Sequence, residues 1–368
     1  MAKKVYIGIG GKARKVKKIY FGVGGKARKV KKAYIGVGGK ARCFYSAGPA
    51  YYGAVTATTS YPRCAVSAGA NRNYGVFAGG YESSDGTYYT TKVNAYSASL
   101  VRSSPTSLGA TMSAISEMHV GGYGVFYGLT DDDSKNIFYA YNSALTLSTG
   151  VFGNGSDNTG SATVGNYGMI GATNTNTTDA LSSSLVATSG PRRTHKYMET
   201  IAQNPSYVIF AGGINLNSTA GTARDAYDAS LTRSTGTLAT AMTYYSSGAS
   251  TSYVGNYAVF SAGVDKDLVV FNTSLTQQVL SGVSLPSKQM QTVNAGGFAW
   301  FIPGLDSGSN VMTTPYILDA ALTLTPLESF AQGRYEHGVC AVGSYVLLGG
   351  GRVPGGSRLN SVEAYTTG

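Results

Sequence analysis

The histidine and cysteine side chains, which most often carry metal or nucleophilic chemistry, are few and scattered. His119, His195 and His337 lie far apart in the chain, and none has a second ligand at a metal-binding spacing. The cysteines are odd in number and contain no CxxC pair, so they predict neither a disulfide framework nor a zinc site. We expect structural or surface roles for the histidines and buried thiols for the cysteines, which are Cys43, Cys64 and Cys340.

Carboxylates offer one further candidate site. Asp131, Asp132 and Asp133, with Asn136 close by, carry the hard oxygens that calcium prefers, but the glycine and distal glutamate of a helix-loop calcium site are missing. The run is therefore interpreted as a solvated turn. The sequence shows neither a nucleophile beside a base nor two carboxylates in matched contexts. We expect no enzymatic activity, no metal and no cofactor.

Arginine and tyrosine provide the candidate binding residues. Arg63, Arg193 and Arg334 each stand shortly before the first strand of a repeated unit, where they either line the rim of a channel and bind acidic sugars or tie down backbone carbonyls. Tyrosines cluster in predicted turns and strand ends, where their rings either stack on sugars or protein partners or fill gaps in the core. These clusters are Tyr51 and Tyr52, Tyr81 with Tyr88 and Tyr89, and Tyr244 and Tyr245.

The excess positive charge is confined to the first 45 residues. They contain 11 Lys and 3 Arg and no acidic residue, a charge of +14, whereas the rest of the chain has 15 basic and 18 acidic residues, a charge of −3. The segment repeats three times with a period of 14, as KVYIGIGGKARKVK from Lys4, KIYFGVGGKARKVK from Lys18 and KAYIGVGGKARCFY from Lys32. In each copy an apolar run, a Gly-Gly turn and an alternating basic run predict a hairpin, and together a β-meander.

This segment is interpreted as an attachment element. Its Gly-Gly-Lys triplets resemble a phosphate-binding loop only superficially, because Ala13, Ala27 and Ala41 stand where a Ser or Thr would hold magnesium. Docking on an acidic protein surface is favoured over nucleic acid, and pairing with other copies of the chain stays open. The predicted docking residues are Lys12, Arg14, Lys26, Arg28, Lys40 and Arg42.

The remainder of the chain consists of seven units. With 50 Gly, 28 Tyr and only 13% charged residues, the composition favours many short strands and turns. An aromatic residue followed by small and apolar residues recurs every 40 to 50 residues, at Tyr74, Tyr123, Tyr167, Tyr207, Tyr257, Phe298 and Tyr345. A second signature, an aromatic residue or Leu with Leu four positions on, shares this period, as in Tyr96 and Leu100. The two signatures predict consecutive strands of one repeated sheet.

A repeat of about 45 residues in which a strand ends in Gly-Gly resembles the kelch family of β-propellers. The resemblance covers about residues 50–368, although Trp300 is the only tryptophan and several units lack the full Gly-Gly pair. It implies an all-β fold, a seven-bladed propeller over residues 46–368 that follows the basic repeats of residues 1–45.

The ends of the propeller region predict how the ring closes. The last unit stops after Val362–Thr366, its predicted third strand, while residues 54–60 form a strand without partners at the other end. An open ring would leave an unpaired edge in each fragment. We therefore expect residues 54–60 to pair as the outer strand of the blade built from about residues 325–368.

The tandem VYIGIGGKARKVKK repeats that lead into a Gly/Ser/Thr/Tyr-rich β-domain resemble the N-terminal modules of structural proteins from phages and prophages of Gram-positive gut bacteria. The resemblance implies a virion component, of tail, baseplate or capsid, that is assembled in the cytoplasm of the bacterial host. Neither a signal peptide nor an apolar run of the roughly 20 residues that a membrane span needs is present.

These observations lead to one functional expectation and two alternatives. The basic repeats dock on other virion proteins, and the propeller binds a glycan or protein of the host surface without turnover. The first alternative is a decoration protein of the capsid or tail that has no receptor. The second is a glycan-processing propeller enzyme, which the missing acid and base residues disfavour.

Overall fold

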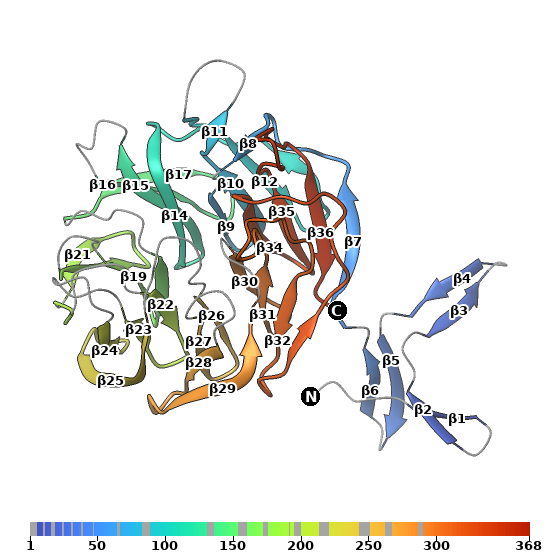
Figure 1. The fold of residues 1–368 in the computed structure, drawn as a ribbon. Coiled ribbons are helices and arrows are strands. Elements are labelled where there is room, and N and C mark those ends of the chain that lie inside the picture. Colours follow the sequence, from blue (N-terminus) through green and yellow to red (C-terminus); the bar gives the residue numbers. More distant parts are fainter. Residues whose placement is uncertain are drawn as a thin grey trace.

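In the computed structural model, the described part of the chain contains strands, turns and loops but no helix (Figure 1). The structure describes residues 6–368 except 10–11, 16–18, 24–25, 31, 38–39, 47, 65–66, 83–88, 131–135, 154–159, 172–175, 191, 195–199, 213–220, 243–250, 262–266 and 286–289. The all-β prediction is confirmed.

Seven four-stranded antiparallel sheets form the blades of a β-propeller, as the sequence predicted (Figure 1). We number the blades 1 to 7 in chain order of their innermost strands, which contact one another around the axis. The innermost strands are β9 (Ser67–Ala70), β14 (Met112–Val120), β18 (Ser161–Val164), β22 (Thr200–Gln203), β26 (Thr251–Val254), β30 (Gln291–Ala295) and β34 (Gly338–Val342). The second strands are β10 (Tyr74–Ala78), β15 (Tyr123–Thr130), β19 (Tyr167–Gly171), β23 (Val208–Ala211), β27 (Tyr257–Ser261), β31 (Phe298–Ile302) and β35 (Tyr345–Gly349).

Two further strands complete each blade toward the outside of the ring. The third strands are β12 (Val93–Ser97), β16 (Asn136–Tyr141), β20 (Thr178–Ser182), β24 (Gly221–Tyr227), β28 (Asp267–Phe271), β32 (Tyr316–Leu318) and β36 (Val362–Thr366). The outermost strands are β13 (Arg102–Ser103), β17 (Leu147–Val151), β21 (Ala187–Gly190), β25 (Arg233–Met242), β29 (Gln277–Ser284), β33 (Leu324–Pro326) and β7 (Ala50–Val55). A short pair, β8 (Arg63–Cys64) and β11 (Tyr81–Glu82), extends blade 1 beyond its four strands.

The hydrophobic core lies between blades. Each of seven buried clusters joins residues of two neighbouring blades, so the clusters run around the ring. Between blades 7 and 1, for example, Phe77 and Tyr96 pack with Leu347 and Ala364. Both faces of each blade are covered in this way, and therefore the second strands are continuous apolar runs rather than alternating ones. The recurrent aromatic residue found in the sequence begins six of these strands, and Tyr207 directly precedes the other.

The leucine of the second signature lies in a turn and not in a strand. In blades 1 to 6 it has a φ of 59° to 62°, a conformation that few residues other than glycine adopt. Each of these turns is held by the side chain three residues before the leucine, as where Asn142 Oδ1 accepts from the amides of Ala144 and Thr146, both at 2.9 Å. The leucine side chains pack into the hydrophobic cluster that their blade shares with the preceding blade. They belong to Leu100, Leu145, Leu185, Leu231, Leu275 and Leu322.

These turns interlock around one face of the ring, which we call the turn face. At five of the seven seams a glycine with positive φ lies so close to the next blade that a Cβ on it would lie 2.6–3.1 Å from a Cβ there. These glycines are Gly121, Gly165, Gly255, Gly296 and Gly343. Four of these glycines face the turn between the third and fourth strands, and Gly296 faces Thr367, which follows β36. At the other two seams an asparagine amide bonds to a carbonyl of the next blade, Asn71 to Asn142 at 2.7 Å and Asn204 to Asn272 at 2.9 Å.

The ring is closed by the N-terminal strand, but over different residues than predicted. β7 (Ala50–Val55) pairs with β36 of blade 7, from Ala50 opposite Thr366 to Val55 opposite Val362. The ladder ends there because β36 begins at Val362 and provides no partner beyond it. Residues 56–60 of the predicted strand 54–60 therefore belong to the connector into blade 1. One residue bulges near Tyr51, a feature that the hydrophobic pattern did not predict.

The basic repeats form three hairpins. Each pairs only within itself over the described residues, so the predicted meander is a series of separate two-stranded sheets. The paired strand ends lie where the repeat predicted, for Ile9 pairs with Lys12, Val23 with Lys26 and Val37 with Lys40. The strands are β1 (Tyr6–Ile9), β2 (Lys12–Lys15), β3 (Tyr20–Val23), β4 (Lys26–Lys29), β5 (Lys32–Val37) and β6 (Lys40–Ser46).

Deleting residues 46–60 is expected to abolish cooperative unfolding of the whole propeller, because the deletion exposes the edge of β36 and removes the buried Val55 from the seam between blades 7 and 1. The measurement is thermal unfolding followed by circular dichroism. Deletion of residues 1–45 is the matched control and should retain the transition. An unchanged midpoint after the first deletion would show that this strand does not close the ring.

Replacing Gly165 with Ala is expected to destabilise the fold by about 1–2 kcal/mol or more, since a Cβ there costs roughly that much at positive φ and would lie 2.8 Å from the Ala229 Cβ. The nearby Gly160 has open space around its Cα, so Gly160→Ala serves as the control. Chemical denaturation measures both. Equal stability of the two variants would contradict the interlocked arrangement of the turns.

Candidate functional site

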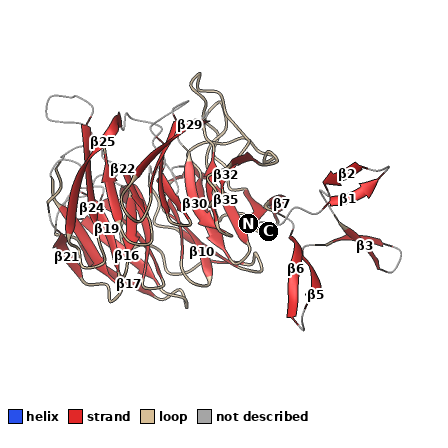
Figure 2. Ribbon diagram, turned by 90° about the horizontal axis from the view of Figure 1, so that it is seen from below, coloured by secondary structure: helices blue, strands red, loops and turns tan. Residues whose placement is uncertain are grey.

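The two faces of the ring differ in construction. Opposite the turn face, the loops between second and third strands and the connectors between blades form what we call the loop face; Figure 2 shows the strands running between long loops at one end and short turns at the other. The predicted ligand-binding residues that the structure describes, Tyr81, Tyr89, Arg63, Arg193 and Arg334, lie in loop-face segments. Tyr88, Tyr244 and Tyr245 are outside the described residues, as are His195 and Asp131–Asp133. Loops on a rigid scaffold commonly carry binding residues.

Arg63 is a structural clamp between blades 7 and 1. Its backbone bonds to blade 7, donating to Leu359 O at 3.0 Å and accepting from the Gly351 amide at 2.8 Å. Its guanidinium bonds to blade 1, donating to Gly79 O at 3.0 Å and Lys92 O at 2.8 Å. Burial lowers the pKa of Arg63 to about 10, so it remains charged at neutral pH.

Arg334 occupies the equivalent place before blade 7. It donates to Gly350 O at 3.0 Å and Ser361 O at 2.9 Å, the same two positions in its blade. Arg193, which is buried between blades 3 and 4, lies over the Phe210 ring at 5.2 Å. All three arginine side chains are buried, an arrangement that favours a structural role over the predicted ligand-binding rim. The alternative, that they tie down carbonyls, agrees with Arg63 and Arg334.

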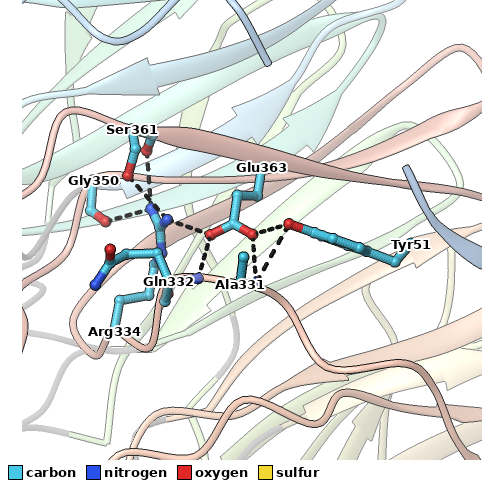
Figure 3. Close-up of polar contacts among 7 residues, drawn as sticks. All are labelled: Tyr51, Ala331, Gln332, Arg334, Gly350, Ser361 and Glu363. Carbon is cyan, nitrogen blue, oxygen red and sulfur yellow. Dashed lines mark hydrogen bonds and ion pairs between the residues drawn. The ribbon is translucent and has the colours of Figure 1, made fainter. Parts of the chain in front are cut away.

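Glu363, on β36, connects the closing strand to this clamp (Figure 3). Its Oε1 pairs with Arg334 Nη2 at 2.7 Å and accepts from the Gln332 amide at 3.1 Å. Its Oε2 accepts from the Ala331 amide at 2.8 Å and from the hydroxyl of Tyr51 on β7. Neither Arg334 nor Glu363 is more than 3% exposed at its side chain. One buried carboxylate thus joins both ends of the propeller region.

The exposed tyrosines predicted at the N-terminal end separate into two roles. Tyr51 belongs to the Glu363 network and packs its ring on Tyr365 at 5.2 Å, so it is part of the closure. Burial, followed by the hydrogen bond to Glu363, raises the pKa of Tyr51 to about 12. Tyr52 points outward and is 53% exposed.

Tyr81 and Tyr89 come together on the loop face of blade 1. Their ring centroids are 4.5 Å apart, and their hydroxyls are hydrogen bonded at 2.8 Å. Beside them, Lys92 Nζ pairs with Glu82 at 3.0 Å and lies 3.2 Å from the centroid of the Tyr61 ring. Sequence reasoning did not identify Tyr61, since it is a single tyrosine before a proline; its place in a connector between blades was the available indication.

The structure describes His119 and His337, which lie in different blades. His337 is buried beneath the loop-face end of blade 7, where burial and Arg334 lower its pKa to about 3. His119 is exposed on β14 at the centre of the ring. Over the described ranges, no three His, Cys, Asp or Glu side chains gather as a metal site would require. Of the cysteines, Cys340 is buried and free.

The predicted docking residues lie on the second strand of each hairpin. Lys12, Lys26 and Lys40 begin these strands, and Arg14, Arg28 and Arg42 lie two residues further on. Each hairpin therefore repeats one basic pair at the same place.

The sequence matches no known family model, and no curated protein is significantly similar to it. The seven-bladed architecture is compatible with a kelch-like propeller. Among the described residues no helix has the length and apolarity needed to cross a membrane.

Replacing Glu363 with Gln is expected to cost about 3–5 kcal/mol, because it leaves the buried Arg334 charge uncompensated. The matched control is Glu336→Gln, which removes a partly exposed pair with Arg352 and should cost about 1 kcal/mol or less. Denaturant unfolding gives both values. A loss no larger than that of the control would show that the closure does not depend on the Glu363 network.

Tyr51→Phe is expected to be less stable than the wild type near pH 8, and the difference should shrink as the pH rises from about 10 to about 12. In that window the unfolded chain releases the Tyr51 proton while the folded chain retains it, so folding of the wild type is progressively disfavoured. Comparing the unfolding free energies of the two proteins across pH removes the contribution of the other tyrosines. A difference that stays constant with pH would contradict the assignment.

Proposed function

We propose that this chain is a non-enzymatic recognition protein of a phage or prophage particle. Residues 1–45 dock on other virion proteins in the tail, baseplate or capsid, and the propeller binds a glycan or protein of the bacterial surface through its loop face. The difference between the two faces carries the proposal. The turn face is filled by interlocking backbone, whereas the loop face carries longer segments and tyrosines.

The direction of the closing strand supports this assignment of faces. β7 begins at Ala50, opposite Thr366 on the turn face, and ends at Val55, opposite Val362 on the loop face. The chain therefore enters the propeller from the turn face, and β6 ends only four residues earlier, at Ser46. A propeller held by residues 1–45 would present its loop face away from the point of attachment.

The charge distribution supports the anchoring role. Residues 1–45 carry +14, and the rest of the chain carries −3. The hairpins repeat a Lys and Arg pair with a fixed spacing, as expected for an acidic surface that offers several equivalent contacts. Many copies on one particle would multiply weak contacts between the loop face and the host.

The truncated chain 46–368 is expected to fold but to be absent from particles, whereas the full chain assembles. Because exposed charges are screened beyond about 8 Å at physiological ionic strength, binding of the full chain to particles that lack it should weaken as salt is added. The measurements are immunoblots of purified particles and a salt titration. Normal incorporation of the truncated chain would exclude docking through the basic repeats.

Adsorption to host cells tests the propeller. Particles whose copies lack residues 46–368 are expected to adsorb poorly, with electron microscopy as the control for intact particles. Normal adsorption would leave decoration of the particle as the better account.

A further inference from the structure

The seam between blades 7 and 1 brings together three segments of the loop face. The connector of residues 56–64 lies on the blade 7 loop of residues 350–361, with the Thr59 amide donating to Asn360 O at 2.8 Å. The same connector pairs with the blade 1 loop through β8 and β11, where Tyr81 lies opposite Cys64. Hydrogen bonds therefore hold these segments in fixed relation to one another.

Aromatic rings form part of this surface, which we call the seam platform and define as Tyr61, Tyr81, Tyr89 and Lys92. Tyr61 is 40% exposed and is oriented by Lys92, whose ammonium lies over its ring. Lys92 is held in turn by Glu82, the residue next to Tyr81. A rigid tyrosine face costs little conformational entropy to use, and its apolar plane with a polar edge suits the C–H face of a sugar ring.

Positive charge predominates beside the platform. Among the described residues 56–64, 79–92, 334–337 and 350–361, five are basic and two are acidic: Arg63, Lys92, Arg334, Arg352 and Arg358 against Glu82 and Glu336. Arg63 bonds to backbone carbonyls, and Arg334 bonds to carbonyls and to Glu363, which lies outside these ranges. Lys92 pairs with Glu82 and Arg352 with Glu336. The backbone of Arg358 forms an isolated β-bridge with that of Arg352. In the described structure no carboxylate lies within salt-bridge distance of the Arg358 guanidinium.

Polar atoms without partners gather under the same seam. In the described part of the chain, buried nitrogens of Arg63, His337 and Arg358 and one oxygen of Glu82 have no hydrogen-bond partner. Gly351 lies between two of these residues, since a Cβ there would lie 3.0 Å from the His337 Cβ and the Gly351 amide donates to Arg63 O. Unsatisfied buried polar groups call for a specific explanation, and a polar ligand or its ordered water provides one.

We infer that the seam platform, together with Arg358, binds a sugar that carries an acidic group, a carboxylate or a phosphate. The inference rests on the proposed recognition role of the loop face and names its ligand class. The sugar ring stacks on Tyr61, and its acidic group pairs with the guanidinium of Arg358, which offers several donors to one anion. Glu82 keeps Lys92 in place, so the platform is organised before the ligand arrives.

The test uses the full chain and three polymers: polygalacturonate, the same polymer with its carboxylates methyl-esterified, and poly(glycerol phosphate). Binding to immobilised polymer is measured by biolayer interferometry. An acidic polymer should bind at least about tenfold more tightly than the neutral ester, as one charge-assisted contact would give. Preference for polygalacturonate or for the phosphate polymer distinguishes a carboxylate from a phosphate ligand. Failure of both acidic polymers to bind overturns the inference.

Variants locate the site. Arg358→Ala should reduce the preference for the acidic polymer by at least about tenfold, because residues 1–45 are the same in every variant and their contribution cancels in the comparison. Tyr61→Ala should weaken binding to every polymer that the wild type binds. The matched controls are Arg72→Ala, an exposed arginine in a turn-face turn of blade 1, and Tyr52→Ala, an exposed tyrosine on β7. Equal losses in the controls overturn the inference, with unfolding midpoints checking that all four variants fold.

Binding of the same variants to host cells separates this inference from the proposed function. If the wild-type propeller binds cells and Tyr61→Ala with Arg358→Ala binds equally well, the platform assignment fails while recognition by the propeller stands. If particles adsorb to host cells equally well with and without the propeller, the proposed function fails instead.

Discussion

The propeller depends on the pairing of β7 with β36. A ring of blades is stable only if its first and last members are joined, because each blade buries its apolar faces on both neighbours. Here the joint combines the ladder from Ala50 to Val55 with the buried carboxylate of Glu363, which contacts the closing strand and the connector into blade 7 at once. Arg334 makes burial of that carboxylate tolerable by pairing with it, and the carbonyls of blade 7 complete the coordination of the guanidinium.

Two kinds of contact hold every seam of the ring. Seven apolar clusters fill the spaces between blades, while the turn face adds one close backbone contact or one asparagine bond at every seam. The leucines with positive φ serve both layers, since the turns that they strain abut a glycine of the preceding blade at four seams and accept an asparagine bond at two others. A strained backbone conformation persists only where its surroundings hold it in place. Here the packing of the leucine side chain holds the positive φ.

The sequence predicted the repeat, the number of blades and the origin of the closing strand, because these follow from periodic aromatic residues and from unpaired ends. It placed the closing strand at residues 54–60, since the pattern around Tyr51 matched the third-strand signature and bulges leave no mark in hydrophobic spacing. It named backbone carbonyls as one of two kinds of partner for Arg63 and Arg334 but not which carbonyls, because backbone atoms are not encoded by residue type. It missed Tyr61 and Lys92, which meet only because Glu82 and the β8–β11 pair bring two loops together.

The direction of β7 has a mechanical consequence. Force applied between residues 1–45 and a ligand on the loop face would enter the ring at Ala50 and run along the axis of the closing strand. The β7–β36 hydrogen bonds lie across that axis, so they would share the load in shear instead of breaking one after another as in an unzipping hairpin. The Tyr51 contact with Glu363 lies near the loaded end of the ladder. The strand that completes the fold is thus also the tether through which tension between the two attachment points would pass.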